Sequence, residues 1–221
     1  MITLGKRTRE NNYGFAQAQS QQSLWQRLNA EQKMQIITAY YKQQVGDNFM
    51  ETIMYKEAES KIKNWLSGIY SPKNWLILIG SCGLGKTIWA KSICQAFNSL
   101  NRNDRFTFDP IKCNGWKMIS ALNLSEIISE YESFDVVCRR HKVFIDDLGT
   151  EPETQNIFGT KRNAVMEILS YRYEHNLPTI LSTNLTIKPT NQIVERYGER
   201  IFDRLKEKAV LIPFVGESFR K

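Results

Sequence analysis

The feature that most constrains how this chain folds is the glycine-rich segment Gly80-Ser-Cys-Gly-Leu-Gly-Lys-Thr87. It directly follows an apolar run at 75–79, typical of a buried strand, and precedes a helical pattern through Ile93, Phe97 and Leu100. Glycines at these spacings let successive backbone N–H groups point at one phosphate, and the start of the helix adds the positive end of its dipole. The segment therefore predicts a phosphate-binding loop between a strand and a helix of an α/β sheet.

Two residues of this loop have specific predicted roles in binding ATP. Lys86 is expected to reach the β- and γ-phosphates, and the Thr87 hydroxyl is expected to bind Mg²⁺. A glycine-rich turn without a ligand is the alternative, which we disfavour because a chance match to this pattern is rare in a chain of 221 residues. Cys82 is interpreted as a bystander whose oxidation would block the nucleotide. The predicted ATP contacts are Gly80, Ser81, Cys82, Gly83, Leu84, Gly85, Lys86, Thr87 and Ile88.

A second segment, Lys142-Val-Phe-Ile-Asp-Asp147, is an apolar strand that ends in two carboxylates. Asp146 is predicted to hold the Mg²⁺ shell, and Asp147 is predicted to orient or deprotonate the attacking water. An apolar run followed by Asp also occurs at ordinary strand ends and helix caps. Because it follows a phosphate loop here, we interpret the pair as the metal-binding and catalytic acids of an ATPase.

After Pro72 the pattern alternates between strands and helices, which predicts a parallel sheet with helices on both faces. One helix is expected to begin at Asn123, with Glu126 in its first turn, and another to cover 165–173. Later helical turns are expected to be broken by Gly198. The predicted strands cover 75–79, 117–120, 142–146, 179–182 and 210–213.

The first 70 residues have a different character. Residues 1–22 are polar and lack an apolar period. Two amphipathic helices are predicted next, one over 29–45 with Asn29 and Gln32 at its start, and one over 49–69. Their apolar face is interpreted as a core against the following domain, and the alternative is a docking face for a partner helix. We expect a helical N-terminal partner-binding region at 1–70 and an ATPase domain at 71–221.

Composition narrows the compartment and the partners. We expect neither membrane insertion nor secretion, because the apolar run at 75–79 is far shorter than the roughly 18 residues of a membrane span. The cysteines form no Cys-x-x-Cys pair, which argues against a zinc site or a disulfide framework and for the cytoplasm. Thirty Lys and Arg against 23 Asp and Glu give a net charge of +7, which suits nucleic acid; a merely soluble basic surface is the alternative.

Four blocks, in this order along the chain, resemble the DnaC/DnaI-type helicase loaders and the IstB-like transposition helpers, which are AAA+ ATPases. The blocks are the strand-loop-helix at the phosphate loop and the segments 143–151, 179–184 and 197–205, and the resemblance spans about 75–221. It implies an α/β AAA+ P-loop NTPase core with a five-stranded parallel sheet flanked by helices. So little follows 216–220 that we expect no full C-terminal lid.

The resemblance also implies roles for three residues in the later blocks. Asn184 looks like the polar sensor that holds the attacking water or the γ-phosphate. By similarity Arg204 would be the arginine finger that reaches the nucleotide of a neighbouring subunit, with Arg200 supporting it. A finger supplied in trans implies ATP-dependent self-association or docking on a hexameric partner. The alternatives are an ordinary Asn at a strand end and surface ion pairs of the arginines with Glu199, Asp203 or Glu207.

The chain departs from the AAA+ pattern at three places. Many AAA+ enzymes carry Asp-Glu where this chain has Asp146-Asp147, so we expect slow hydrolysis, with Glu151 as a supporting acid. After segment 216–220, which is similar to a terminal motif of the subgroup, we expect no room for a full helical lid that carries the usual second sensor, and Arg220 is a candidate nucleotide contact. The N-terminal region lacks the cysteine and histidine ligands of the zinc-binding appendage of some loaders, which leaves a helical helicase-docking module.

The function expected from these residues and the resemblance is an ATP-hydrolysing protein that loads or regulates a hexameric, DnaB-like replicative helicase on single-stranded DNA. The alternative that the shared blocks leave open is an IstB-like ATPase helper of a DNA transposase. A small-molecule P-loop kinase is disfavoured because it has no use for the blocks at 182–184 and 198–204, and a nucleotide-gated adaptor with little turnover is a fourth hypothesis. DNA backbone contacts are expected from Arg139, Arg140, Lys142, Lys161 and Arg162.

Overall fold

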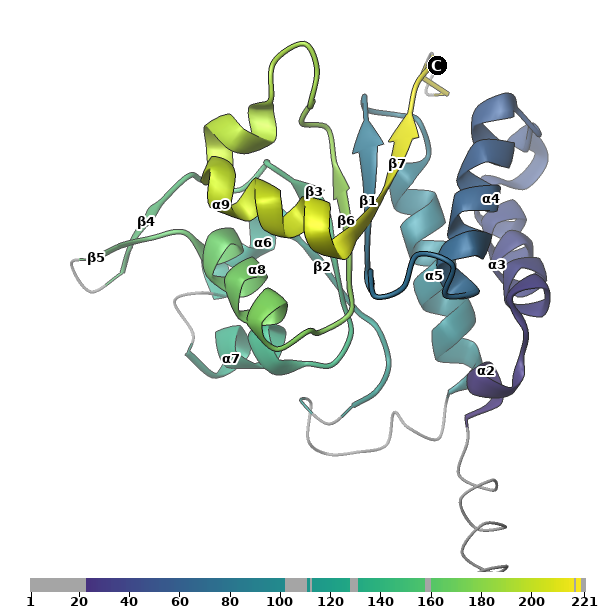
Figure 1. Cartoon of the computed structure of the whole chain (residues 1–221), viewed down its shortest axis with the longest axis horizontal. Coiled ribbons are helices and arrows are strands. Elements are labelled where there is room, and N and C mark those ends of the chain that lie inside the picture. The colour runs from purple at the N-terminus through teal and green to yellow at the C-terminus, as the bar shows by residue number, and fades with distance from the viewer. Residues whose placement is uncertain are drawn as a thin grey trace, which may run out of the picture.

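A five-stranded, entirely parallel sheet with the strand order β2-β3-β6-β1-β7 lies at the centre of the molecule (Figure 1). The predicted parallel sheet is thereby confirmed. Its strands are β1 (Trp75–Gly80), β2 (Lys117–Ser120), β3 (Val143–Leu148), β6 (Thr179–Thr183) and β7 (Ala209–Phe214). The computed structural model describes residues 23–101, 111, 113–127, 131–157, 160–216 and 218–219.

Successive side chains of each strand point to opposite faces, so the sheet serves two hydrophobic cores. Leu76 and Leu78 of β1 join the core under α5, whereas Ile77 and Ile79 join the core on the other face, under α8 and α9 (Figure 1). Burial on both faces is the reason why β1 is an unbroken apolar run. The helices of this α/β part are α5 (Lys86–Leu100), α6 (Ala121–Ile127), α7 (Tyr131–Arg139), α8 (Ala164–Glu174) and α9 (Gln192–Lys208).

The strand order places the carboxyl ends of three strands side by side. β6 lies between β1 and β3. Its register pairs Thr183 with Ile79 of β1 on one side and with Leu148 of β3 on the other, across an irregularity between Ile145 and Leu148. The loops that leave these strands therefore start at one edge of the sheet, where open α/β sheets bind their ligands.

The segment before β1 forms α2 (Leu24–Arg27), α3 (Ala30–Val45), the 3₁₀ turn η1 (Gly46–Asn48) and α4 (Ile53–Leu66). The predicted capping pair opens α3: the Asn29 side chain accepts the Gln32 N–H at 2.9 Å, and the Gln32 side chain accepts the Asn29 N–H at 3.0 Å.

The second N-terminal helix is shorter than predicted, because it does not cover 49–69 but only 53–66. Thr52 caps its start, where the hydroxyl accepts the Tyr55 N–H at 3.1 Å, and Gly68 with φ 80° lies beyond its end. Phe49 and Met50 are therefore not helical but belong to the connection between η1 and α4.

α3 and α4 pack on α5 through aromatic rings. The ring centroids of Tyr41 and Trp89 are 4.4 Å apart, and those of Tyr55 and Trp89 are 5.0 Å apart. Ile37 and Ile62 are fully buried in the same core as strands β1 and β7. The N-terminal helices therefore form a layer on the α5 face and do not stand apart as an appendage (Figure 1).

Three further elements bear on the sequence predictions. The helix expected to open at Asn123 begins at Ala121, directly after β2, because Ala121 and Leu124 are both buried in the core. A short antiparallel hairpin, β4 (Gln155–Ile157) and β5 (Thr160–Arg162), was not predicted, since three-residue strands are too short to show a period. α9 is kinked at Gly198 (φ 79°, ψ 164°), as predicted.

Within the described ranges, no helix is long and apolar enough to cross a membrane.

Candidate active site

The glycine-rich loop leaves β1 and turns into α5, as predicted. A Cβ at Gly80 (φ 149°) would lie 2.1 Å from the carbonyl oxygen of Phe214, so only glycine fits there. Gly85 precedes the first residue of α5 in the left-handed conformation (φ 85°), and a Cβ there would lie 3.2 Å from the Tyr41 hydroxyl. The loop is therefore held closely against both β7 and α3.

Lys86 and Asn184 are brought together from 98 positions apart. The Lys86 ammonium donates hydrogen bonds of 2.7 Å to the carbonyl oxygens of Gly80 and Ser81 and to the side-chain oxygen of Asn184. Lys86 is buried, whereas Asn184 is exposed at the end of β6. The fold thus joins two predicted site residues across the phosphate loop.

Thr87 and Asp146 form the second such contact, with the Thr87 hydroxyl 2.8 Å from Asp146 Oδ1. The same carboxylate oxygen accepts the hydroxyl of Ser182 at 2.5 Å. Ser182 is fully buried, and its oxygen also accepts the Asp147 N–H at 2.9 Å. No role for Ser182 was predicted from the sequence. Its place on β6, two residues before Asn184 and so on the same face, is the signal that could have indicated one.

The oxygen donors at Thr87 and Asp146 suit Mg²⁺. In nucleotide sites this ion is typically held by one or two protein oxygens together with phosphate oxygens and water. The described ranges contain no cluster of three or more His, Cys, Asp or Glu side chains that could hold a metal by themselves. The residues therefore fit a metal that arrives with a nucleotide.

Asp147 has a left-handed backbone (φ 55°), which is uncommon for a residue with a side chain. Its N–H is held by Ser182, and its carbonyl oxygen accepts the N–H and the hydroxyl of Thr150 at 3.1 and 2.8 Å. Asp147 and Asn184 both line the pocket over the phosphate loop. The predicted base and the predicted sensor therefore face the same space.

That pocket measures about 340 Å³. One wall is the phosphate loop with Asp147 and Asn184, and the opposite wall comes from the N-terminal helices and the C-terminal segment. Burial and the neighbouring Tyr55 raise the pKa of Tyr41 to about 12, so this wall offers a neutral ring at physiological pH. Its residues are Tyr41, Gln44, Val45, Asn48, Phe49, Met50 and Phe219.

None of these opposite-wall residues was assigned to the site from the sequence. Helical periodicity over 29–45 indicates which face is buried, but not what covers it. Phe219 reaches the pocket because its N–H bonds to the Gly83 carbonyl oxygen at 3.1 Å. Arg220, the expected contact in this segment, lies outside the described residues.

The two predicted arginines do not line the pocket. Arg204 is largely buried, pairs with Glu174 at 3.2 Å and lies 4.7 Å from the centroid of the Tyr173 ring. Its contact with Glu174 is an ion pair that the sequence analysis did not name. Arg200 is exposed, and no ion-pair partner for it occurs in the described part of the chain. A role in trans stays a prediction for both.

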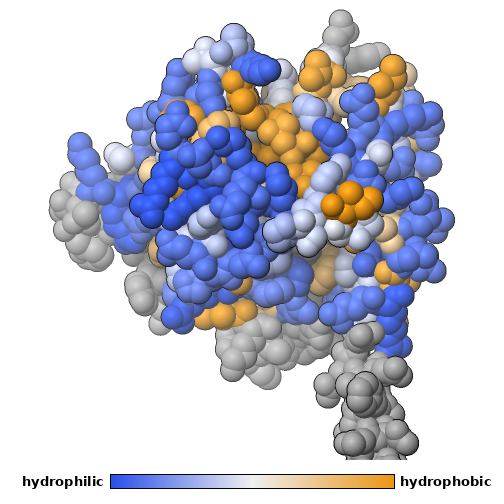
Figure 2. Space-filling view, viewed as in Figure 1, coloured by the Kyte–Doolittle hydropathy of each residue, from blue (hydrophilic) through white to orange (hydrophobic). Residues whose placement is uncertain are grey.

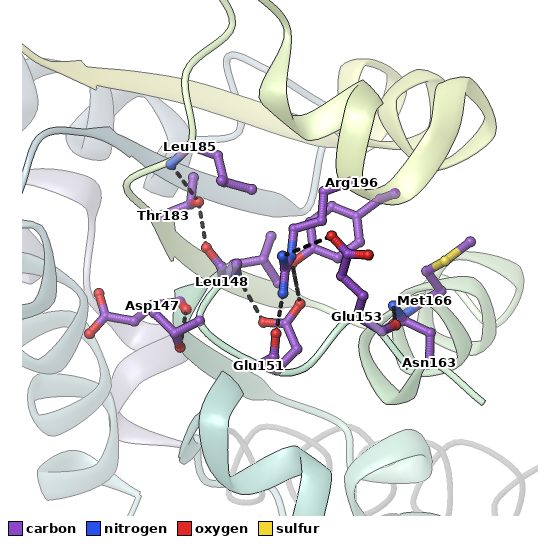
Figure 3. A network of polar contacts seen from close by, with 12 residues as sticks. Asp147, Leu148, Glu151, Glu153, Asn163, Met166, Thr183, Leu185 and Arg196 are labelled. Atoms are coloured by element: carbon purple, nitrogen blue, oxygen red, sulfur yellow. Dashed lines mark hydrogen bonds and ion pairs between the residues drawn. The ribbon is translucent and has the colours of Figure 1, made fainter. Parts of the chain in front are cut away.

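Glu151 is not placed to support the chemistry in the pocket, contrary to the expectation from the sequence. Its side chain is 2% exposed and is directed at α9 (Figure 3). The carboxylate accepts the Tyr197 hydroxyl at 2.5 Å and the Gly149 N–H at 2.9 Å. Because these contacts hold the buried carboxylate, it does not line the pocket.

Four of the five basic residues expected to contact DNA have partners inside the protein. The fifth, Lys161, is exposed. A DNA phosphate would compete with these contacts. The partners are Asp135 for Arg139, Gly115 and Cys113 for Arg140, Asn114 for Lys142, and Glu167 for Arg162.

A second pocket, of about 630 Å³, lies away from the phosphate loop, between α9, β7 and the segment before β1. Figure 2 shows apolar surface at this place, surrounded by hydrophilic residues. Lys61 and Lys73 stand at its border and donate to the carbonyl oxygens of Leu211 and Ala209 on the edge strand. None of the predicted site residues lines it.

In this sheet β6, with Asn184 at its end, lies between the phosphate-loop strand and the strand that carries the two acids. With the pocket above it, this arrangement defines an ATP-binding protein with the AAA+ fold. More narrowly, the chain belongs to the family of IstB-like ATP binding proteins, whose sequence model matches residues 20–221.

Several solved structures share the fold. The DnaC helicase loader has a TM-score of 0.54 and 17% identity, over 76% of this chain and 95% of that chain. A Streptococcus pyogenes serotype M3 protein assigned as a primosome component has a TM-score of 0.55 and 16% identity, over 77% and 84% of the two chains. AMPPCP-bound DnaA from Aquifex aeolicus has a TM-score of 0.52 and 16% identity, over 76% and 49%. A search of curated proteins finds no match. The predicted resemblance and the α/β fold are confirmed.

Proposed function

We propose that this protein hydrolyses ATP with Mg²⁺ and uses the nucleotide cycle to load or regulate a hexameric replicative helicase on single-stranded DNA. The observation that carries the ATPase part is the pair of contacts from Lys86 to Asn184 and from Thr87 to Asp146. They join the phosphate loop to the ends of β6 and β3, next to the Asp147 carboxylate.

In this proposal the Lys86 ammonium donates hydrogen bonds to the γ-phosphate, in place of those it donates to the oxygens of Gly80, Ser81 and Asn184. Thr87 and Asp146 would hold Mg²⁺, which offsets the charge of the phosphate oxygens when bound. Asp147 orients the attacking water and accepts its proton, and the Asn184 amide contacts that water or the γ-phosphate. Since Asp is one methylene shorter than Glu, we expect slow hydrolysis.

The opposite wall of the pocket is proposed to bind the base. Tyr41, Phe49 and Met50 offer apolar surface, which is what a nucleobase stacks on. Gln44 and Asn48 add amide groups that can hydrogen-bond a base edge. The N-terminal helices then contribute to nucleotide binding as well as to partner binding.

The remaining positive charge is proposed to come from a neighbouring copy. No arginine lines the pocket as described, while P-loop ATPases commonly stabilise the transition state with one. Arg200 can reach outward without losing an ion pair, whereas Arg204 would first have to leave Glu174. The complete site would then exist only between protomers.

The helicase part of the proposal draws on the solved structures with this fold, among them a helicase loader and a protein assigned as a primosome component. The net charge of +7 suits single-stranded DNA, bound through its backbone and therefore weakened by salt. Ile53 and Ile69 are 80% and 68% exposed in the N-terminal layer, which supports a docking face there.

The second candidate is an ATPase helper of a DNA transposase. What favours it is the match to the IstB-like family, which begins at residue 20 and so includes the N-terminal helices. The ATPase chemistry is the same in both cases, and only the partner differs.

The test uses the full chain, because deleting residues 1–70 would remove part of the shared core. The protein, loaded with a slowly hydrolysed ATP analogue, is mixed separately with the purified replicative helicase and the purified transposase of its host. Helicase retention that is lost in Lys86→Ala and in the surface variant Ile53→Glu supports the loader. Retention of the transposase alone supports the second candidate, and retention of neither overturns both.

A further inference from the structure

Glu151 is a buried carboxylate that the proposed chemistry does not use. It lies four residues after Asp147 and does not line the nucleotide pocket. Its contacts run between the loop that follows β3 and the first half of α9 (Figure 3). Burying a carboxylate is costly unless it is paired and hydrogen-bonded, so these contacts define its role.

On the side of β3, Glu151 holds the turn that sets the backbone of Asp147. Its Oε2 accepts the Gly149 N–H at 2.9 Å. Gly149 has φ 104°, and a Cβ there would lie 2.9 Å from the Leu185 side chain, so this position of the turn requires glycine and lies directly against Leu185. Thr150 closes the same turn on the Asp147 carbonyl oxygen. Movement of the Glu151 carboxylate would therefore shift the backbone at Asp147, two residues before Gly149.

On the side of α9, the same carboxylate holds two consecutive residues. Oε1 accepts the Tyr197 hydroxyl at 2.5 Å and lies 3.3 Å from Arg196 Nε. Arg196 Nη2 also donates to the Glu151 carbonyl oxygen. Burial, with Glu151 adjacent, holds the pKa of Tyr197 well above its usual range, so the phenol remains a donor. These contacts lie just before the kink at Gly198.

Beyond that kink, α9 carries Arg200 and Arg204, which the proposed function assigns to the nucleotide of a neighbouring protomer. We infer that Glu151 is a positioning residue that couples Asp147 to α9, so that the acid that orients water in one protomer and the arginines presented to the next move together. The inference rests on the proposed ATP hydrolysis. Its physical basis is that charge-assisted bonds in a dry site tolerate little displacement.

The variant that tests this is Glu151→Gln. Glutamine keeps the shape and an acceptor for Tyr197, but it removes the charge opposite Arg196 and directs an amide N–H toward the Gly149 N–H. Glu153→Gln is the matched control, because it makes the same change in a side chain that is 78% exposed and lies 3.8 Å from Arg196. Tyr197→Phe removes a single donor and serves if Glu151→Gln does not fold.

Two measurements are made on the full chain: steady-state hydrolysis with the Kd for ATP, and amide hydrogen exchange with and without a slowly hydrolysed ATP analogue. We expect Glu151→Gln to lower kcat about tenfold or more while the Kd for ATP changes less than about twofold, and Glu153→Gln to match the wild type. In the wild type, the analogue should protect amides at both 80–88 and 192–204. In Glu151→Gln, only the protection at 80–88 should remain.

A wild-type kcat in Glu151→Gln, or protection at 192–204 that survives the substitution, would overturn the coupling. So would a parallel fall in kcat, affinity and Tm, which is the signature of a merely structural residue. If the wild type binds ATP without hydrolysing it, the proposed function fails by itself, and the exchange measurement alone then decides whether Glu151 couples the two sites.

Discussion

The Lys86 ammonium lies 2.7 Å from the side-chain oxygen of Asn184, so one hydrogen bond joins the phosphate loop to the end of β6. A phosphate that approaches the ammonium must loosen this bond, which frees the Asn184 amide at the same moment. In the proposed function, binding of the γ-phosphate and placement of the Asn184 side chain are therefore linked through this one contact.

Replacing Lys86 with Ala should abolish this link and weaken ATP binding about 100-fold, because several charge-assisted hydrogen bonds to phosphate are lost. Titration with a fluorescent ATP analogue measures the effect. Lys91→Ala, which removes an exposed lysine from the same helix, is the control and should bind like the wild type. Equal affinities for the two variants would contradict the role of Lys86.

Ser182→Ala should lower kcat about tenfold, because the Asp147 N–H loses its acceptor and Asp146 loses a donor. The free energy of unfolding should fall by about 1–2 kcal/mol, as expected for an unsatisfied buried group. Hydrolysis assays and urea unfolding measure the two effects, with Ser99→Ala on α5 as control. A loss of stability with unchanged kcat would show that Ser182 only supports the fold.

Met50→Ala should weaken ATP binding about fivefold, since it removes apolar surface from the wall proposed for the base. Its 69% exposure implies no loss of Tm. Competition by inorganic tripolyphosphate, which has no base, should be unchanged. Ile53→Ala, also exposed but outside the pocket, is the control. Equal weakening for ATP and tripolyphosphate would place Met50 near the phosphates instead.

Substitutions of Arg200 and Arg204 in α9 should have different effects. Arg204→Ala should lower the free energy of unfolding by up to about 1 kcal/mol, a small value because Glu174 is more than half exposed. Arg200→Ala should leave Tm unchanged. It should abolish the part of the hydrolysis rate per protomer that rises with protein concentration. Mixing it with Asp147→Asn, which retains Arg200 and lacks the base, should restore activity; a mixture that stays inactive would argue against an arginine supplied in trans.

Arg172→Lys should destabilise the fold by about 3 kcal/mol. The Arg172 guanidinium is fully buried and donates to carbonyl oxygens of the segment 137–141 and of Pro178, and to the Thr179 hydroxyl. A lysine cannot reach this many acceptors from one position. Urea unfolding measures the change, with the exposed Arg139→Lys as control; equal stability of the two would contradict this role.

Local patterns predicted the elements whose conformation depends on neighbouring residues. The phosphate loop, the start of α3 at Asn29 and the break at Gly198 follow from glycine geometry and side-chain capping, which need no distant contact. Where the apolar spacing and a local cap disagreed, the prediction was less accurate: the second helix was expected to begin at Phe49 but begins at Ile53, after the Thr52 cap. Phe49 and Met50 line the pocket over the phosphate loop instead.

The sequence by itself determined that the chain has a phosphate loop, two acids at the end of one strand and a polar residue at the end of another. These features can be predicted because they depend on residue types at fixed spacings along the backbone. Only the tertiary structure decided that Glu151 is directed at α9, that Arg204 pairs with Glu174, and that Tyr41 lines the pocket over the phosphate loop. These side chains meet groups far away in the chain, and which of them meet depends on how helices pack on the sheet, which no local pattern contains.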